Sequence, residues 1–193
     1  MGLENAVTVV ETAWGFCAVS AQEAGLWTSS LPEGTPEAAL RAARITGVPR
    51  AGCQPTACPP NDAPAHSAVL QAAAAFLQAY FLGEPSAPQV PLALEDLPPF
   101  TRKVLEACCR IGPGEIATYG QLARAAGVPE AARAVGQAMA HNRLPLFVPC
   151  HRVVGSGGRL TGFGGGLDLK ARLLTLEGLK VKSQGAGNWR VVS

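Results

Sequence analysis

Residues 118–142, TYGQLARAAGVPEAARAVGQAMAHN, decide the architecture of the second half of the chain. Two helical patterns are interrupted at Gly127, Val128 and Pro129, and two helices joined by a tight turn that contains glycine are typical of a helix-turn-helix. The second pattern is rich in small side chains that would let its backbone approach a partner closely, and Arg133 is the long basic residue among them. Small-sided helices also occur in tightly packed cores, so the motif alone leaves both interpretations open.

Charge separates the two halves of the chain. Residues 1–99 hold three Arg against nine Asp and Glu, a net charge of −6, whereas residues 100–193 hold thirteen Lys and Arg against five Asp and Glu, a net charge of +8. A basic half that also contains a helix-turn-helix pattern favours binding to a polyanion such as nucleic acid. The alternative is that the uneven charge only solvates the surface.

Length and composition limit the class of protein. A chain of 193 residues with 48% hydrophobic residues predicts one large or two small folded domains. No apolar run approaches the roughly 20 residues of a membrane-spanning helix, and residues 1–10 lack the pattern of a signal peptide. Six cysteines in such a chain favour reduced thiols over a disulfide framework. We therefore expect a cytoplasmic protein, nucleoid-associated in a prokaryote, with no membrane partner.

Cys53, Cys58 and His66 follow a Cys-x4-Cys-x7-His spacing. Paired zinc ligands are more often two to four residues apart, and a fourth ligand is missing nearby. We expect neither a metal nor any other cofactor.

The segment FVPCHRVVGSGG, residues 147–158, places Cys150 directly before His151. Only the thiolate of cysteine attacks well, so an imidazole that takes the thiol proton would activate Cys150 as a nucleophile. A third group should orient the imidazole, and Glu177 at the end of the last helical pattern is the candidate. The alternative interpretation is a buried, unreactive cysteine.

The first half of the chain predicts a small α/β domain. Strand patterns at residues 6–10, 14–20 and 25–32 precede helical patterns at 35–47 and 66–83. Thr35 is a suitable N-cap, and Gly47 and Gly83 are suitable ends. We expect an N-terminal domain over residues 1–85, a proline-rich linker over 86–99, a mainly helical domain over 100–180 and a loose polar tail over 181–193.

Several motifs occur together in a fixed order: YGQLA at 119–123, RAVGQAM at 133–139, Asn142, PCHRVV at 149–154 and GGLDLKARLLTLE at 165–177. Together they resemble the O6-alkylguanine-DNA alkyltransferases, strongly from about residue 99 to 178 and more weakly upstream, at AYFLGE (79–84) and PLAL (91–94). The resemblance implies an α+β fold with an RNase H-like N-terminal α/β domain and a helical, helix-turn-helix C-terminal domain.

The resemblance also implies direct-reversal DNA repair. Such a protein is a methylated-DNA–protein-cysteine S-methyltransferase that moves an alkyl group from O6 of guanine in duplex DNA irreversibly to its own cysteine, once. The resemblance implies a monomer that flips the damaged base out of the duplex, and it leaves O4-alkylthymine open as a second substrate.

Roles for five residues follow from the resemblance, position by position. Cys150 would be the acceptor, His151 its base through a water molecule, and Glu177 the residue that orients His151. Asn142 would support the turn at the active site. Tyr119 would help to rotate the damaged nucleotide and protonate the departing base.

The same resemblance implies a DNA surface and a base pocket. Arg133 would fill the base stack after extrusion, from a helix that enters the minor groove. The DNA-binding set is completed by Thr118, Ala132, Ala134 and Gly136. The base pocket would be walled by Val153, Val154 and the loop that begins at Gly155, with Phe163 near the alkyl group and Gly164 beside it. Phe163 stands where tyrosine is usual in the family and Gly164 where some relatives have serine, which leaves the range of alkyl groups open.

Three other functions would use part of these features. A non-catalytic sensor of alkylated DNA would lack the nucleophile, but Cys150 is present. A Cys–His hydrolase would need an oxyanion hole and would leave the helix-turn-helix unexplained. A DNA-binding regulator would leave PCHRVV unexplained and would not depend on Cys150.

Overall fold

The computed structural model describes residues 6–45, 65–185 and 187–192. The chain forms two compact units, Met1–Asp96 and Leu97–Ser193, so the division falls inside the predicted linker. No helix within the described ranges is long and apolar enough to cross a membrane. Cys53 and Cys58, which raised the question of a metal site, lie outside the described residues.

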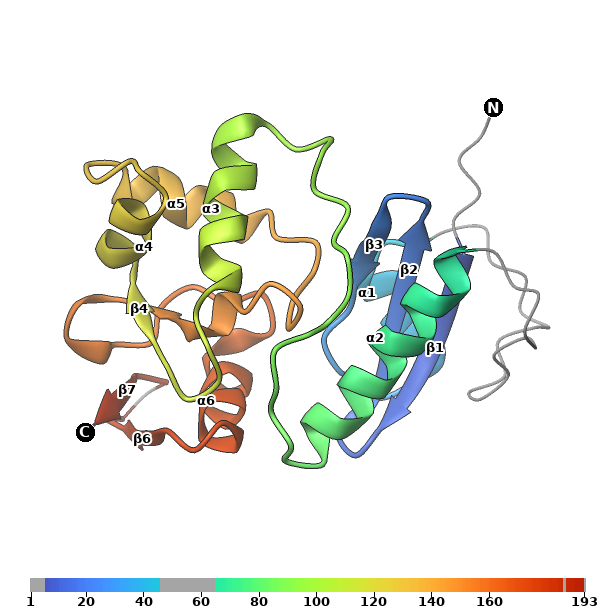
Figure 1. The fold of residues 1–193 in the computed structure, drawn as a ribbon. Coiled ribbons are helices and arrows are strands. Elements are labelled where there is room, and N and C mark those ends of the chain that lie inside the picture. Colours follow the sequence, from blue (N-terminus) through green and yellow to red (C-terminus); the bar gives the residue numbers. More distant parts are fainter. Residues whose placement is uncertain (1–5, 46–64, 186, 193) are drawn as a thin grey trace. The chain divides into compact units, whose positions relative to one another are not determined.

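The N-terminal unit is built on a three-stranded antiparallel sheet. Its strands β1 (Ala6–Thr12), β2 (Gly15–Gln22) and β3 (Gly25–Ser29) follow one another in space as in sequence. Helices α1 (Pro36–Ala42) and α2 (Ala65–Phe81) cover opposite faces of this sheet (Figure 1). The predicted small α/β character is confirmed, whereas the RNase H-like classification stays a prediction.

Local signals set the ends of both helices. The Thr35 side chain accepts a hydrogen bond from the Ala38 amide at 3.1 Å, as its predicted capping role requires. Gly83, with φ of 92°, follows the end of α2, because its missing Cβ permits this left-handed conformation. Helix α1 ends earlier than predicted, with Ala43 as its C-cap, and Gly47 lies outside the described residues.

Part of the predicted linker belongs to the N-terminal unit instead. Leu26 of β3 donates its amide to the Pro91 carbonyl at 2.8 Å and accepts the Ala93 amide at 2.9 Å. The approach is so close that a Cβ on Gly25 would lie 2.5 Å from the Pro91 oxygen. The linker prediction was wrong at these residues because proline-rich composition does not prevent main-chain pairing with an edge strand.

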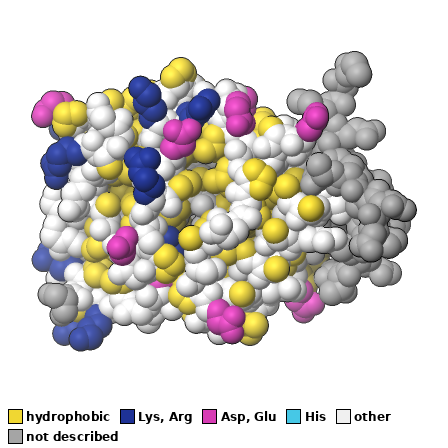
Figure 2. Space-filling view, in the orientation of Figure 1, with side chains coloured by type: hydrophobic (Ala, Val, Ile, Leu, Met, Phe, Trp, Pro, Cys, Tyr) yellow, Lys and Arg dark blue, Asp and Glu magenta, His cyan; other side chains and the backbone are white. Residues whose placement is uncertain are grey.

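The C-terminal unit is mainly helical, as predicted. It contains α3 (Pro99–Cys109), α4 (Tyr119–Ala125), α5 (Ala132–Ala140) and α6 (Gly166–Leu176), with short 3-10 turns η1 (Cys150–Arg152) and η2 (Ser156–Gly158). The break between α4 and α5 confirms the turn predicted around Gly127, which has φ of 75°. Their assignment as a helix-turn-helix stays a prediction. On the face shown in Figure 2, the Lys and Arg side chains lie over this unit.

Two short parallel strands join distant parts of the C-terminal unit. Strand β4 (Ala117–Thr118) pairs with β5 (Val153–Val154), with Ala117 opposite Val153 and Thr118 opposite Val154. The residues just after β4 are thereby held beside the segment that contains Cys150.

The residues predicted as a loose tail form a hairpin instead. Strand β6 (Lys180–Ser183) pairs antiparallel with β7 (Trp189–Val192). Val181, Trp189 and Val191 pack against a buried cluster of the same unit. The tail prediction failed because polar residues separate these three in the sequence. Their side chains form an apolar face only when they pack against the buried cluster.

Candidate active site

Cys150 begins the short turn η1 and is half-buried. Its amide donates to the Val148 carbonyl at 2.7 Å, which closes a tight turn just before the thiol. Leu146 in the same segment has φ of 74°, an uncommon left-handed conformation for a branched residue, and its side chain is buried. Such strain persists only where the surroundings fix the backbone, and it often accompanies a functional turn.

Asn142 holds this turn from the other side. Its Nδ2 donates to the Val148 carbonyl at 3.1 Å, and its Oδ1 accepts the Leu144 amide at 3.0 Å. The Asn142 side chain also makes a hydrogen bond to Cys150 that favours the thiolate. The role of Asn142 in supporting an active-site turn stays a prediction, to which these contacts are suited.

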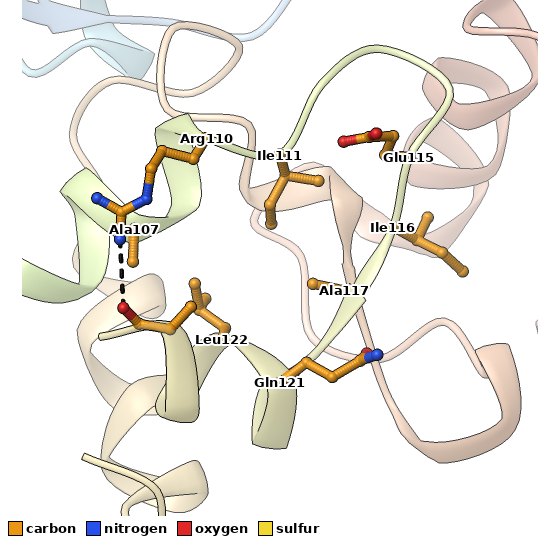
Figure 3. Close-up of a pocket in the computed structure, with 9 residues that line it drawn as sticks. Ala107, Arg110, Ile111, Glu115, Ile116, Ala117, Gln121 and Leu122 are labelled. Atoms are coloured by element: carbon orange, nitrogen blue, oxygen red, sulfur yellow. Dashed lines mark hydrogen bonds between the residues drawn. The ribbon is translucent and has the colours of Figure 1, made fainter. Parts of the chain in front are cut away.

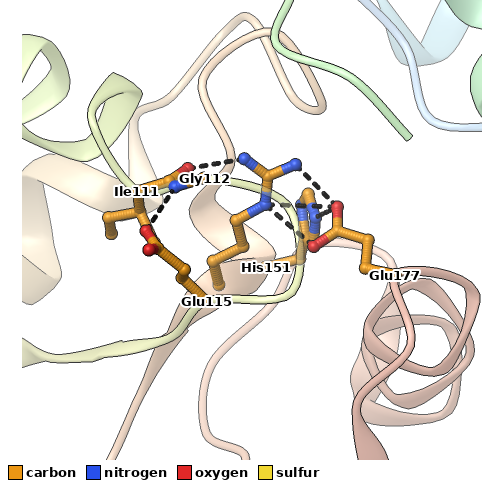
Figure 4. Close-up of polar contacts among 6 residues, drawn as sticks. Ile111, Gly112, Glu115, His151 and Glu177 are labelled. Atoms are coloured by element: carbon orange, nitrogen blue, oxygen red, sulfur yellow. Dashed lines mark hydrogen bonds and ion pairs between the residues drawn. The ribbon is translucent and has the colours of Figure 1, made fainter.

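His151 and Glu177 form a buried pair. The His151 Nε2 lies 2.9 Å from Glu177 Oε1, and both side chains are fully excluded from solvent. Figure 4 shows the two side chains meeting where the end of α6 approaches η1. Because Glu177 engages Nε2, the imidazole presents Nδ1 as its second nitrogen. The structure thus brings together two residues that are 26 positions apart in sequence.

Arg152 completes this pair and was not identified as a functional residue from the sequence. Its Nε donates to Glu177 Oε2 at 2.9 Å, and its Nη2 donates to Oε1 at 2.7 Å. Its Nη1 donates to the Ile111 carbonyl at 2.6 Å, which ties the pair to the segment after α3. Glu177 therefore orients an imidazole and a guanidinium at once (Figure 4).

Burial and charge set the protonation of this group. Burial lowers the pKa of His151 below its ordinary value, although the hydrogen bond and charge of Glu177 partly oppose this. Burial alone would raise the pKa of Glu177, but its hydrogen bonds with His151 and Arg152 outweigh that effect and lower the pKa to about 2. At neutral pH the site therefore holds a neutral imidazole, which can accept a proton, beside an ionised carboxylate.

The thiol itself is held protonated at rest. Burial raises the pKa of Cys150 above its ordinary value, and the hydrogen bond from Asn142 and the charge of Lys170 only partly offset this. These surroundings favour the protonated thiol over the thiolate preformed by the neighbouring histidine that the Cys150–His151 sequence suggested.

Lys170 is a second functional candidate that the sequence reasoning missed. Its side chain is fully buried, and its Nζ donates to the carbonyls of Val153 at 2.6 Å and Thr161 at 2.8 Å. Burial lowers its pKa to about 8, while Cys150 and Cys108 oppose this shift. Its position in the sequence offered a signal, because Lys170 shares a helical face with Leu167, Ala171 and Leu174.

Tyr119 lies at the junction of several elements of the site. It starts α4 directly after β4, and a Cβ on Gly136 of α5 would lie 3.8 Å from its ring. A Cβ on Gly162, in the loop before α6, would lie 3.7 Å from its hydroxyl. The Tyr119 side chain therefore lies near both Gly136 of α5 and Gly162 of the loop before α6.

The helix α5 presents Arg133 to solvent, while Ala132, Ala134 and Gly136 are half-buried. Thr118 caps α4 in a reciprocal capping box with Gln121. Both features are compatible with a DNA surface on α4 and α5, and the assignment of DNA-contacting residues stays a prediction.

The predicted base-pocket residues differ in burial. Val153 and Val154 are fully buried, and Val154 belongs to an apolar cluster with Leu160. Gly155 and Phe163 are half-buried and Gly164 is exposed. Their assignment to a base pocket stays a prediction.

A separate pocket lies in the same unit. It has a volume of about 520 Å³ and opens between α3, α4 and the segment that joins α3 to β4 (Figure 3). Its lining includes Arg110, whose Nη2 donates to the Ala125 carbonyl at 3.2 Å, and Ile111, whose carbonyl accepts Arg152. Cys150 and His151 do not line it. Among the described residues, no group of three or more His, Cys, Asp and Glu side chains could hold a metal ion.

Comparison with known proteins agrees with this geometry. The profile of the family described as "6-O-methylguanine DNA methyltransferase, DNA binding domain" matches residues 99–179. A methylated-DNA--protein-cysteine methyltransferase of Mycolicibacterium paratuberculosis is 50% identical over 101 residues, which are 52% of this chain and 61% of that protein. The match therefore spans less than two thirds of that relative.

Solved structures extend the similarity to both units. The crystal structure of Mycobacterium tuberculosis O6-methylguanine methyltransferase has a TM-score of 0.67 and 33% identity, covering 90% of this chain and 93% of that one. The crystal structure of Mycobacterium tuberculosis OGT in complex with DNA has a TM-score of 0.66 and 32% identity, covering 89% and 92%. With identity above 30% over nine tenths of these relatives, the protein belongs to the 6-O-methylguanine DNA methyltransferase family.

Proposed function

We propose that this protein repairs O6-alkylguanine in double-stranded DNA by moving the alkyl group to its own Cys150. The observation that carries the proposal is the buried His151–Glu177–Arg152 group directly after a half-buried thiol. Relatives named as methylated-DNA--protein-cysteine methyltransferases support the reaction, and the OGT–DNA complex supports DNA as the partner.

The proposed reaction moves two protons between groups of the site. The thiol proton of Cys150 passes through a water molecule to Nδ1 of the neutral His151, while Glu177 holds Nε2. The sulfur attacks the alkyl carbon, the S–C bond forms and the C–O6 bond breaks. The electron pair stays on the departing guanine, which takes a proton from Tyr119. The thioether is stable, so each protein molecule reacts once and acts as a monomer without a cofactor.

DNA recognition is assigned to α4 and α5. The exposed Arg133 enters the duplex and replaces the extruded guanine in the stack, and the small side chains of α5 allow close approach in the minor groove. Extrusion is required because O6 cannot be reached inside the duplex. O4-alkylthymine, which carries its alkyl group on an equivalent exocyclic oxygen, is a second substrate to test.

The first test is mass spectrometry after mixing the protein with a duplex that carries one O6-methylguanine. We expect one added methyl group on Cys150, saturating at one equivalent, and none in the Cys150→Ser variant, which still binds the duplex. Tight binding to the damaged duplex without a mass change would instead indicate a sensor. Turnover beyond one equivalent would overturn the single-use reaction.

A second test separates DNA recognition from chemistry. Arg133→Ala should slow repair of the duplex far more than reaction with a free modified base, because the free base needs no extrusion. Equal loss in both assays would refute the role of Arg133 in the stack.

A further inference from the structure

The C-terminal hairpin, strands β6 and β7, joins the loop that follows the nucleophile. Arg159 of this loop forms an antiparallel bridge with Arg190 of β7. The Leu160 amide donates to the Trp189 carbonyl at 2.8 Å, and the Gly155 amide donates to the Arg159 carbonyl at 2.8 Å. Main-chain contacts thus pair the loop over residues 155–161 with the edge of strand β7.

The contact is tight at one glycine. A Cβ on Gly158 would lie 2.8 Å from the Val191 carbonyl oxygen, a separation that real side chains essentially never show. The neighbouring Gly157 has a left-handed φ of 67°, similar to the φ of 75° at Gly158. A Cβ on Gly157 would meet only the Arg190 Nη1, at an ordinary 3.9 Å. The two glycines therefore differ in their contact with β7 and hardly in backbone strain.

The hairpin is also anchored to α6. The indole Nε1 of Trp189 donates to Asp168 Oδ1 at 2.7 Å, in the first turn of α6. Val181, Trp189 and Val191 pack on the cluster that contains Val154 and Leu160. Leu160 of the loop and Val154 of strand β5 therefore share one packed cluster with the hairpin.

The other end of the same loop reaches the reaction centre. The Thr161 carbonyl accepts the buried Lys170 Nζ, which also binds the Val153 carbonyl just after η1. Gly162, the next residue, lies against the Tyr119 hydroxyl. The loop 155–162 therefore runs from the C-terminal hairpin to the neighbourhood of Tyr119.

We propose that the C-terminal hairpin is a positioning element that fixes the loop 155–161 in the conformation that receives the extruded purine base. The proposal rests on the proposed alkyl transfer. A loop that is ordered before binding loses less conformational freedom when the base arrives, so the hairpin raises affinity for the base. The hydrogen bonds of the thiol come from Asn142 and from the backbone of its own turn, so neither the hairpin nor the loop 155–161 supplies one.

Single-turnover kinetics with free O6-benzylguanine test this separation, since the free base needs the pocket but no duplex. Gly158→Ala and Gly157→Ala both carry the penalty of a left-handed glycine, and only Gly158→Ala clashes with β7. We expect the half-saturating base concentration of Gly158→Ala to exceed that of Gly157→Ala by about tenfold, the upper range for one lost hydrogen bond. The limiting rate and the rate of Cys150 alkylation by iodoacetamide, which does not need the pocket, should agree between the two variants within about twofold.

A second pair of variants tests the anchor without touching the loop. Asp168→Ala removes the acceptor of the Trp189 indole, whereas Asp168→Asn keeps an acceptor oxygen and removes the same charge. We expect Asp168→Ala to raise the half-saturating base concentration and Asp168→Asn to restore it.

The outcomes separate this proposal from the proposed function. Failure of the wild-type protein to react with either O6-benzylguanine or a methylated duplex would refute the alkyl transfer itself. A reactive wild type with equal half-saturating concentrations in the two glycine variants would refute only the positioning role. A parallel loss of iodoacetamide reactivity in Gly158→Ala would also refute it, because the hairpin would then act on the thiol.

Discussion

Replacing Glu177 by Gln tests the buried ion pair that the site depends on. Glu177 accepts from His151 at 2.9 Å and from two nitrogens of Arg152 at 2.9 and 2.7 Å, with its side chain fully buried. Glutamine has nearly the same shape but leaves the Arg152 guanidinium buried without a countercharge. Removing one partner of a buried pair costs about 3–5 kcal/mol, because the remaining charge stays desolvated.

The pKa of Glu177 supports a similar magnitude. Its value of about 2 lies below the ordinary 4.5, a difference that corresponds to about 3 kcal/mol of stabilisation at neutral pH. Because the folded-state pKa is the lower one, this stabilisation is fully present above pH 4.5 and is lost as the pH falls through 2. A ¹³C titration of the Glu177 carboxyl should therefore have its midpoint near 2.

The assay is urea unfolding of the full chain at pH 7, with hydrogen exchange of α6 amides to assign the transition to the C-terminal unit. We expect Glu177→Gln to lower the free energy of unfolding of this unit by about 3–5 kcal/mol. The matched control is Glu106→Gln, which removes an exposed pair with Arg102 whose side chains are 46% and 48% accessible. Such a surface pair contributes about 0.5 kcal/mol. A change of less than about 1 kcal/mol in Glu177→Gln, within the range of surface pairs, would refute the reasoning.

Three further predictions follow from the same contacts. Lys170→Met should become less stable relative to wild type as the pH rises from 8 to 10.5, with a difference in unfolding free energy that grows by about 3 kcal/mol. The reason is that the wild type gains stability when its buried amine becomes neutral above the folded-state pKa of about 8, and methionine has no such group. Equal pH profiles of the two proteins in urea unfolding would contradict this. Thr118→Ala should lower the unfolding free energy by about 1 kcal/mol, because the Gln121 amide loses the cap oxygen at 3.2 Å; hydrogen exchange at the start of α4 measures it. The single-turnover rate should fall as the pH drops through the lowered pKa of His151 and stay level between pH 6.5 and 8, since the imidazole is neutral above its pKa; a rate that already falls between pH 8 and 7 would exclude His151 as the base.

The sequence pointed to the pairing of His151 with Glu177, which the structure shows, whereas the role of Cys150 as the nucleophile stays a prediction. Cys150, His151 and Glu177 stand in sequence motifs that can be recognised by their order along the chain, without knowledge of the fold. The capping residue Thr35 and the terminal Gly83 were equally accessible, since their effects are local in sequence.

Features that depend on tertiary partners were out of reach. The pairing of β4 with β5 involves two residues on each strand, too few for a hydrophobic pattern. The hairpin of β6 and β7 partly buries three side chains only because they pack against the cluster around Val154 and Leu160. Strand propensity reflects such packing more than any preference of the backbone.

Arg152 and Lys170 show why charged residues of the site escape sequence reasoning. Both would ordinarily be placed on the surface, because ionised side chains are almost never fully buried unless paired. Here the pairing comes from distant residues: Glu177 for Arg152, and two backbone carbonyls for Lys170. The protonation of the site has a separate cause, the burial of Cys150 and His151 themselves. This burial favours the protonated thiol and the neutral imidazole, while the charge of Lys170 opposes it at the thiol. In the proposed alkyl transfer, a thiol that stays protonated until its substrate arrives avoids loss to other electrophiles.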